Sequence, residues 1–472
     1  MTEIKAKYNK KSAKSILKHG ELLLGHSLKD LYNDAVIFPG KGGLGASVEY
    51  FHYGYNPNSE ADPDFIEAGL ELKCTPLKLL ADNSMAAKER LVLNIINYIK
   101  EANETFSTSS FWRKNKFLLL MFYLHESGVN PVDMFFKLIR TWEFPNEDLK
   151  IIKDDWNFIH NKILQGKAHE LTEGDTFYLA PCMKGSKAGE EMRNQPFSKE
   201  LAQQRAYSLK QGYINKIILT SYLDENIQHQ LKLTSRRVQS LVKKYSSEKI
   251  VKRTNSYKRN ETFEELLERR MKPFYGKTVA QIEKKFKVEL SKNSKDFAYN
   301  VCKTILGIKK KKIEEFENAG IIMKSVVLEA NRDYIKESMS FPYIRFTEII
   351  SQDWIESDWY QTLSSKFLFA IFRKSPDGNK SNMKFVKIFF WNMPYTDLCK
   401  AELLWQDTKQ KVLTNNYDSF ITSKSNSICH VRPHGTKGQM ILTPQGEKVQ
   451  PKCFWLNNHY ILNVVKEKLK MQ

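Results

Sequence analysis

The sequence predicts a mixed α/β protein made of two tandem domains, and three observations lead to this prediction. The chain has 472 residues, which is long enough for two domains of ordinary size. Its hydrophobic fraction of 41% and aromatic fraction of 12% are sufficient for folded cores. Short apolar runs of strand character are mixed in both halves with longer segments of helical period. Each half is therefore expected to contain a central mixed sheet with helices around it.

The individual elements are predicted from the spacing of apolar residues. Residues 14–34 have the apolar spacing of a helix, and the stretch Lys41-Gly-Gly-Leu-Gly45 predicts a turn before a helix over 46–54. The other elements expected in the first half are buried strands over 66–75 and 116–124, then helices over 149–165 and 198–209. The second half is expected to repeat this organisation, with strands near 320–328, 365–373 and 384–391.

A short acidic motif falls on the first predicted strand. Asp64 follows a proline and stands seven residues before Glu71, with Lys73 two residues further on. Glu71 and Lys73 lie on the same face of a strand, because strand side chains alternate. Asp64 and Glu71 offer oxygen ligands to a hard divalent cation, and Lys73 can sit beside a water that attacks a phosphodiester. The motif is short, so the alternative of a solvated strand edge with alternating charge stays open without further context.

Charge and cysteine content narrow the class of protein. The formal net charge is +20, as expected for a protein that binds a polyanion, although a merely soluble basic protein is the alternative. The six cysteines are scattered without a C-x-x-C pair, which argues against a zinc site or a disulfide framework. No apolar run of 18 residues and no secretory signal is evident, so no membrane association and a cytoplasmic location are expected.

The two halves contain a weak repeat at an offset of about 250 residues. The segment from Asp64 to Lys73 aligns without a gap with the segment from Glu315 to Lys324. Three further matches follow in the same order, and they begin at Ser109 and Ser364, at Tyr178 and Ile428, and at Arg205 and Lys452. In this alignment Ile322 replaces Glu71, and a site that lacks one of two carboxylates does not hold Mg²⁺ tightly. The second half is therefore predicted to be catalytically inactive.

These patterns predict three regions. Residues 1–225 form the catalytic domain, 226–262 a basic linker and 263–472 the degenerate copy. Residues 231–260 carry ten Lys and Arg against one Glu, in a polar stretch that favours a linker or a helix-rich connector. Contact of this stretch with a phosphate backbone is an equally open interpretation.

With Lys41-Gly-x-x-Gly45, Glu49, Asp64, Glu71-Leu-Lys73 and Lys116, the first half resembles the MutH family of GATC-specific endonucleases. The whole chain, with its degenerate second copy, resembles the two-domain type II restriction enzymes of the Sau-three-A type. The resemblance implies a mixed sheet of the restriction-endonuclease-like type in two tandem MutH-like domains. It also implies Mg²⁺-dependent double-strand cleavage of DNA at GATC that leaves 5′-phosphates. The second domain would bind another GATC as an effector, and two chains would pair on looped DNA.

The resemblance also implies roles for individual residues. Asp64, Glu71 and Glu49 would be the acidic metal ligands, Lys73 would polarise the attacking water, and Lys116 would be an additional catalytic lysine. Residues expected to contact DNA are Lys184, Arg205, Tyr207 and Lys210 in the first domain, and Arg432, His434 and Lys452 in the second. One departure is that the family has Arg-Pro-Lys where the first domain has Cys182-Met183-Lys184, whereas the second keeps Arg432-Pro433-His434. Base recognition is therefore expected to be distributed differently between the copies.

Three other functions compete with this interpretation. A mismatch-repair nicking endonuclease would need only one domain, so the second copy argues against it. A non-catalytic DNA-binding protein would not need the intact set of Asp64, Glu71 and Lys73. An RNA-binding protein would need exposed aromatic stacking platforms, and no RNP-like motif is present.

Overall fold

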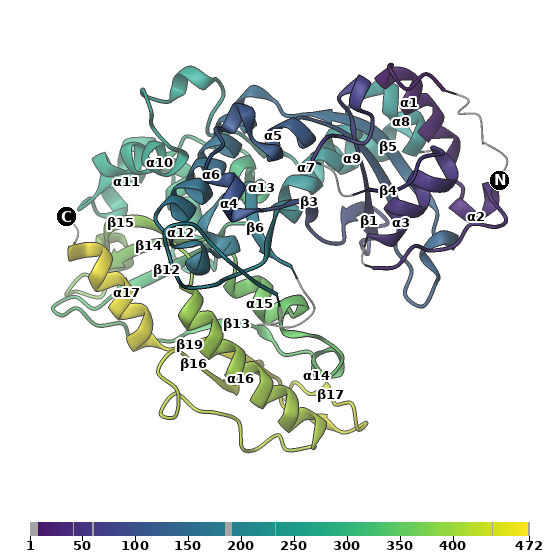
Figure 1. The fold of residues 1–472 in the computed structure, drawn as a ribbon. Helices are drawn as coiled ribbons and strands as arrows, with labels where there is room; N and C mark the ends of the chain where they lie inside the picture. Colours follow the sequence, from purple (N-terminus) through teal and green to yellow (C-terminus); the bar gives the residue numbers. More distant parts are fainter. Residues whose placement is uncertain are drawn as a thin grey trace. The chain divides into compact units, whose positions relative to one another are not determined.

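The computed structural model describes residues 8–40, 42–58, 61–184, 191–231, 233–436 and 438–470, so Lys41 of the predicted turn lies outside the described residues. Two compact units are present (Figure 1). Unit 1 comprises residues 1–169, 176–256 and 310–320, and unit 2 comprises 170–175, 257–309 and 321–472. The border between them near residue 256 falls inside the region predicted as a linker. No helix in the described part of the chain is long and apolar enough to cross a membrane.

The larger sheet of unit 1 has four strands in the order β2-β1-β4-β5. Strands β1 (Glu71–Leu79) and β4 (Phe117–Leu124) are parallel, with Glu71 opposite Leu118. Strands β5 (Phe136–Glu143) and β2 (Met85–Ala87) are antiparallel to β4 and β1, respectively. The central strand β4 is apolar throughout because both of its faces are covered by other elements.

Helices at the start of the chain pack on this sheet. Helix α1 (Ala13–Gly20) contacts β5, and α3 (Gly43–Ser47) contacts β1 and continues as a π-helix over Val48–His52 (Figure 1). Their apolar residues form one buried cluster with those of the strands, which includes Ile16, Leu44, Val48, Phe65, Leu72, Leu119 and Met121. This core fixes the π-helix next to the beginning of β1, so the position of Glu49 relative to Glu71 is set by packing.

A second, smaller sheet of unit 1 has β9 at its centre. Strand β9 (Arg205–Leu209) pairs antiparallel with β3 (Leu91–Ile95) and with β6 (Leu179–Met183). Helix α6 (Asn146–Leu164) contacts β6, and α5 (Ser110–Asn115) contacts β3. All five residues of β9 are buried as a result.

Unit 2 contains two main sheets, and each has three strands. In the first, β12 (Ile322–Leu328) is parallel to β14 (Phe367–Arg373), which is antiparallel to β15 (Lys384–Trp391). In the second, β19 (Lys452–Leu456) lies between β13 (Met339–Tyr343) and β16 (Cys429–Pro433), antiparallel to both.

The other elements connect or cover these sheets. The remaining helices of unit 1 are α2 (Leu28–Leu31), α4 (Tyr98–Glu101), α7 (Gln211–Ser221), α8 (Glu225–Leu231), α9 (Ser235–Lys244) and α13 (Glu314–Ala319). Those of unit 2 are α10 (Phe263–Met271), α11 (Val279–Phe286), α12 (Phe297–Ile305), α14 (Phe346–Ile349), α15 (Asp358–Leu363), α16 (Tyr395–Leu413) and α17 (Asn458–Lys470). Short strands are β7 (Met192–Arg193), β8 (Ala202–Gln203), β10 (Ser247–Glu248), β11 (Lys312–Ile313), β17 (Ile441–Leu442) and β18 (Lys448–Val449).

Most of the predicted elements are confirmed, with changes at glycines. The helix predicted over 14–34 is divided into α1, a 3-10 turn and α2, because Gly25 has a φ of +79° and the side chain of Ser27 caps a new helix start. The strand predicted from residue 66 begins only at Glu71, after a 3-10 turn that ends at Gly69 with a φ of +62°. The other predicted strands, the helix over 149–165 and a helix over most of 46–54 are present.

The helix predicted over 198–209 is wrong. This segment forms β8 and β9, and β9 is hydrogen-bonded to a strand on each side. The pattern of apolar residues was compatible with a helix, but tertiary pairing decided the conformation of a segment that is buried on both faces.

Candidate active site

Asp64 and Glu71 are brought together by a tight turn. Phe65 and Leu70 form an isolated antiparallel bridge, and the 3-10 turn between them reverses the chain. The backbone N–H of Asp64 donates to Glu71 Oε2 at 3.1 Å, and the N–H of Leu72 donates to Asp64 Oδ2 at 2.8 Å. The two carboxylates predicted as metal ligands therefore lie side by side at the start of β1.

Two lysines approach the same oxygen of Glu71. The Glu71 side chain is 1% exposed, its Oε1 accepts a hydrogen bond from Lys73 Nζ at 2.5 Å, and Lys114 Nζ lies 3.6 Å from the same atom. A charged carboxylate buried to this extent needs such partners. Burial lowers the pKa of Lys73, but the charge of Glu71 and the hydrogen bond to it outweigh this effect and raise that pKa overall. Lys73 is therefore a cation fixed in the site.

Besides Lys73, the lysine that approaches Glu71 is Lys114. The sequence predicts Lys116 as the additional catalytic lysine. Lys114 lies in the last turn of α5 and is largely buried. Lys116 is the exposed residue that follows this helix. Residues two positions apart on a helix face different directions, and the sequence Lys114-Asn115-Lys116 gave no indication of which lysine faces Glu71. The structure does not bring Lys116 to the carboxylates.

Glu49 faces the same group of charges from the π-helix. Burial, and then the charge of Asp64, raise the pKa of Glu49 to about 8, while Lys73 opposes this effect. Burial and the charge of Glu71 likewise raise the pKa of Asp64 to about 7. Both half-buried carboxyls therefore ionise less readily than free ones, first because of burial and then because of a neighbouring carboxylate. The described residues contain no group of three His, Cys, Asp or Glu side chains already placed to hold a metal ion, so the role of Glu49 as a third ligand stays a prediction.

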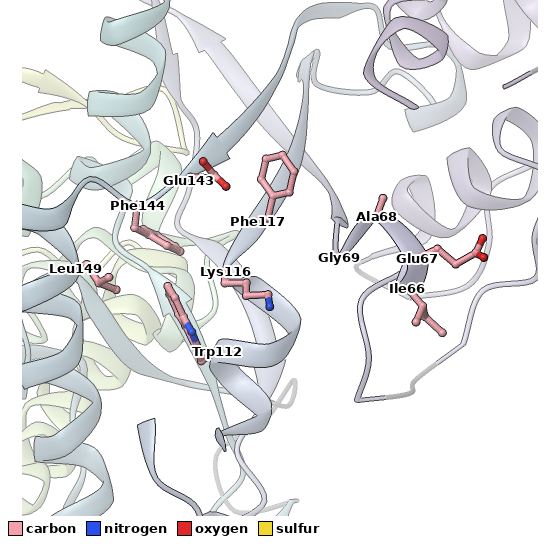
Figure 2. Close-up of a pocket in the computed structure, with 10 residues that line it drawn as sticks. All are labelled: Ile66, Glu67, Ala68, Gly69, Trp112, Lys116, Phe117, Glu143, Phe144 and Leu149. Carbon is pink, nitrogen blue, oxygen red and sulfur yellow. The ribbon is translucent and has the colours of Figure 1, made fainter. Parts of the chain in front are cut away.

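A groove of about 590 Å³ opens beside the turn that carries Asp64 (Figure 2). Ile66, Glu67, Ala68 and Gly69 line one side of it, and this segment leads directly into β1. Trp112, Lys116 and Phe117, together with Glu143, Phe144 and Leu149, line the other side. Lys116 therefore belongs to the wall of a groove next to the acidic site.

Two of the four residues predicted to contact DNA in the first domain are buried in the smaller sheet. Arg205 is 1% exposed and donates from Nη1 to the carbonyl of Pro181 at 2.9 Å. Tyr207 is 0% exposed and donates from its hydroxyl to Glu101 Oε1 at 2.7 Å. Contact with DNA is at odds with this burial, because β9 is a central strand. We assign both side chains to the core of unit 1.

The other two residues are half-buried. Lys210 donates from Nζ to the carbonyl of Thr176 at 2.6 Å, where the chain enters α7. Lys184 follows β6, and its backbone N–H donates to the carbonyl of Gln204 at 2.9 Å. Residues 185–190, which follow Lys184, lie outside the described residues. Base contacts by Lys184 and Lys210 remain predictions.

The residues predicted to contact DNA in unit 2 gather around aromatic rings at the ends of β16 and β19. The guanidinium of Arg432 lies 3.7 Å from the ring centre of Trp455, and the ring of His434 meets the same indole edge-on at 5.0 Å. Lys452 Nζ lies 5.7 Å from the ring centre of Phe420. Arg432 and His434 are exposed whereas Trp455 and Phe420 are buried, so this cluster offers basic side chains to a ligand.

The segments of the second half that align with the acidic site do not form such a site. Glu315, which aligns with Asp64, accepts hydrogen bonds from the backbone N–H groups of Ile250 and Val251, both at 2.9 Å. Lys324, which aligns with Lys73, donates from Nζ to the carbonyl of Ser340 at 3.1 Å, and burial lowers its pKa. Lys324 has no carboxylate partner in the described part of the chain, and Ile322 replaces Glu71, so these segments lack the oxygen ligands of a metal site.

The fold and the site together define a class of protein. Two carboxylates and a lysine at the start of a strand in a mixed sheet have the composition of a metal-dependent phosphodiesterase site. The family model of the DNA mismatch repair enzyme MutH matches residues 53–155, which include Asp64, Glu71, Lys73 and Lys114.

Similarity over nearly the whole chain then gives the particular family. The chain is 33% identical over 471 residues to the type II restriction enzyme Sau3AI of Staphylococcus aureus, and the match covers 92% of this chain and 90% of that enzyme. The chain belongs to the family of this restriction enzyme. This confirms the predicted family and the predicted class of enzyme, a site-specific deoxyribonuclease of type II.

Proposed function

We propose that the protein cuts both strands of DNA at GATC sites in a Mg²⁺-dependent reaction that leaves 5′-phosphates. The observation that carries this proposal is the cluster of Asp64, Glu71 and Lys73, within a chain similar over nearly its full length to a type II restriction enzyme. GATC is a palindrome, so each strand offers the same sequence to an active site.

The residues present fit a divalent cation. Asp64 and Glu71 would hold Mg²⁺, and Glu49 would be a further acidic ligand. Carboxylate oxygens are the ligands that Mg²⁺ prefers. The pKa values of Asp64 and Glu49 are raised first by burial and then by neighbouring negative charge, and a cation would offset both effects. When bound, Mg²⁺ supplies Lewis-acid stabilisation of charge on the phosphate and lowers the pKa of a water in the site.

The chain's own residues would orient the reacting groups. Lys73 is held by Glu71 and carries a positive charge where the attacking water would lie. Lys114 adds a second ammonium group within 3.6 Å of Glu71, close enough to offset negative charge that develops on the phosphate. We therefore propose Lys114, and not Lys116, as the additional catalytic lysine. In-line attack would expel the 3′-oxygen and leave the phosphate on the 5′ side.

We further propose that unit 2 is a degenerate copy of unit 1. Both units contain a parallel pair of strands followed by an antiparallel one, and the register shifts between Phe122 and Tyr123 and between Ile371 and Phe372. Helices α6 and α16 each have 19 residues and each follow a proline.

The strand registers correct one detail of the sequence repeat. Leu118 lies opposite Glu71, and Phe367 lies opposite Ile322. If Leu118 is aligned with Phe367, then Lys116 aligns with Ser365, and Phe117 aligns with Lys366. The sequence match that begins at Ser109 and Ser364 pairs Lys116 with Lys366, so that pairing differs from the strand register by one residue.

Loss of the acidic residues leaves DNA binding as the function we propose for unit 2. In the order of elements, α12 corresponds to α3 and the π-helix, which carries Glu49. Helix α12 contains no carboxylate side chain. Arg432 and His434 are exposed and Lys452 is half-buried. We propose that through this basic cluster unit 2 binds a second GATC as an effector, and that two chains pair on looped DNA.

Cleavage of two supercoiled plasmids tests the proposal, one with a single GATC and one with several, in Mg²⁺. Fast linearisation of the plasmid with several sites and slow cutting of the other would support it. Glu71→Ala should abolish cutting, and Glu67→Ala is a matched control because Glu67 is an exposed carboxylate that pairs only with Lys11 in the described residues.

A second candidate is a nicking endonuclease of the mismatch-repair type, which the match of the MutH family model favours. Nicked circles as the final product on both plasmids would support this candidate. Binding without Mg²⁺-dependent cleavage would contradict both.

A further inference from the structure

Tyr55 connects the two segments that carry Glu49 and Asp64. Its backbone N–H donates to the carbonyl of Glu49 at 3.2 Å. Its ring packs edge-on against the ring of Phe65, with centroids 5.6 Å apart at 80°. Phe65 directly follows Asp64 in the chain. Tyr55 is therefore anchored through its backbone to one acidic residue and through its ring to the neighbour of another.

The hydroxyl of Tyr55 is buried and makes no hydrogen bond within the described residues. A buried polar atom without a partner costs about 1–3 kcal/mol, so native structures contain few of them and each requires an explanation. Burial, and then the negative charges of Asp64, Glu49 and Glu71, raise the pKa of this hydroxyl. The hydroxyl is therefore a buried hydrogen-bond donor, on a side chain that is anchored between Glu49 and Phe65.

A tyrosine that served only for packing would not need its hydroxyl. The ring alone fills the space against Phe65, and phenylalanine would do so without leaving a buried donor unpaired. The charges that act on the hydroxyl are those of the acidic site, and Asp64 is the strongest of them.

We propose that Tyr55 is a positioning residue of the acidic site, whose hydroxyl donates a hydrogen bond to the Asp64 carboxylate when a divalent cation is bound. Asp64 is already held on one side by the N–H of Leu72. A second donor would fix the plane of the carboxylate, as partners of metal ligands commonly do. This inference rests on the proposed function, because it assumes that Asp64 binds a cation.

Binding of Mn²⁺ to the full-length protein without DNA tests the proposal, since Mn²⁺ takes the same oxygen ligands as Mg²⁺. Isothermal titration calorimetry of Tyr55→Phe should show a dissociation constant about tenfold weaker than that of the wild type, as expected for loss of one hydrogen bond to a charged group. Tyr50→Phe is the matched control, because Tyr50 lies next to Glu49 on the π-helix and its side chain is exposed. Its dissociation constant should not change.

Thermal unfolding separates positioning from packing. In EDTA, Tyr55→Phe should melt at or slightly above the temperature of the wild type, and Mn²⁺ should raise its melting temperature less. Excess Mn²⁺ should restore its cleavage rate with KM for DNA unchanged. Equal Mn²⁺ affinity in wild type and Tyr55→Phe, or a lower melting temperature of the variant in EDTA, would overturn the proposal.

The titration also distinguishes this proposal from the one on which it rests. Saturable binding by the wild type that is lost in Glu71→Ala but unchanged in Tyr55→Phe would overturn the role of Tyr55 alone. Absence of saturable binding by the wild type would overturn the metal site itself, and the role of Tyr55 with it.

Discussion

Glu71 is the residue at which the charges of the site meet. Its side chain is 1% exposed, and both Lys73 and Lys114 approach its Oε1. If both lysines were replaced, Glu71 would be a buried charge without compensation. If only one lysine were replaced, the other would still compensate the charge of Glu71. The three residues are therefore expected to act as a unit, with effects of substitution that are not additive.

Replacement of the two candidate lysines distinguishes them. Lys114→Ala is expected to lower the cleavage rate about 100-fold, because the site loses an ammonium group that stabilises developing charge. Lys116→Ala is the matched control two residues away, and it should alter the rate by less than about fivefold through weaker phosphate contact. Single-turnover cleavage of an oligonucleotide duplex measures both. A larger loss in Lys116→Ala than in Lys114→Ala would contradict this assignment.

The raised pKa values of Asp64 and Glu49 predict how stability depends on pH in EDTA. The pKa values of about 7 and 8 exceed those of the unfolded chain, so the folded protein binds more protons than the unfolded chain between about pH 4 and 8. The free energy of unfolding should therefore fall as pH rises through this range, by on the order of several kcal/mol.

Urea unfolding at a series of pH values measures this dependence. Glu49→Gln should flatten the profile, because its side chain does not titrate, whereas Glu67→Gln should leave it unchanged. A profile of Glu49→Gln that matches the wild type would contradict the assignment of the shift to Glu49.

At the scale of elements, the site depends on the turn before β1. Gly69 has a φ of +62° and ends the 3-10 turn that reverses the chain between Asp64 and Glu71. A Cβ at this position would meet no atom within 4 Å, so only the backbone conformation requires glycine. The left-handed conformation is unfavourable for residues with a Cβ.

Gly69→Ala is therefore expected to lower the free energy of unfolding by about 1–2 kcal/mol. It should also reduce cleavage, since relaxation of the turn would move Asp64 away from Glu71. Gly42→Ala is a suitable control, because its φ is −90° and an added Cβ would meet no atom within 4 Å. Chemical denaturation and cleavage rates of both variants provide the measurement. Full activity and stability of Gly69→Ala would show that the turn tolerates a side chain.

At the scale of the whole molecule, we propose that cutting and effector binding are divided between two units of similar topology. The acidic cluster lies in unit 1, and the cluster of Arg432, His434 and Trp455 lies in unit 2. Phosphate contacts by basic side chains make DNA binding depend on salt. A change in unit 2 should therefore affect the response to a second site more than the chemistry of cleavage.

Arg432→Ala tests this division. The variant should lose most of the rate advantage on a plasmid with several GATC sites, by about tenfold, and should cut a single-site plasmid at the wild-type rate. Arg332→Ala is the matched control, because Arg332 also lies over an aromatic ring in unit 2, 4.6 Å from the ring centre of Tyr334. Equal effects of the two substitutions would indicate a general loss of positive charge. No effect of either would contradict effector binding through this cluster.

Several features of the protein were predictable from the sequence. The shared strand face of Glu71 and Lys73 was predictable because strand alternation is a local pattern. The turn between Asp64 and Glu71 was not predicted. Buried strands such as β4 and β14 were found because their apolar runs are continuous. The family and the class of enzyme followed from motifs in a fixed order, and similarity over nearly the whole chain confirmed them.

Other features were decided by tertiary structure alone. Whether 202–209 is helix or strand depended on pairing with β3 and β6, which are distant in sequence. The same pairing buried Arg205 and Tyr207, which the sequence offered as DNA contacts. The choice of Lys114 over Lys116, and the burial of the Tyr55 hydroxyl, depended on packing between segments that are distant in sequence.

The sequence by itself thus determined which chemical groups this protein has and the local order in which they occur. The tertiary structure decided which of these groups meet. The physical reason is that strand alternation and turn formation depend on neighbouring residues, whereas burial and pKa values depend on atoms contributed by distant segments.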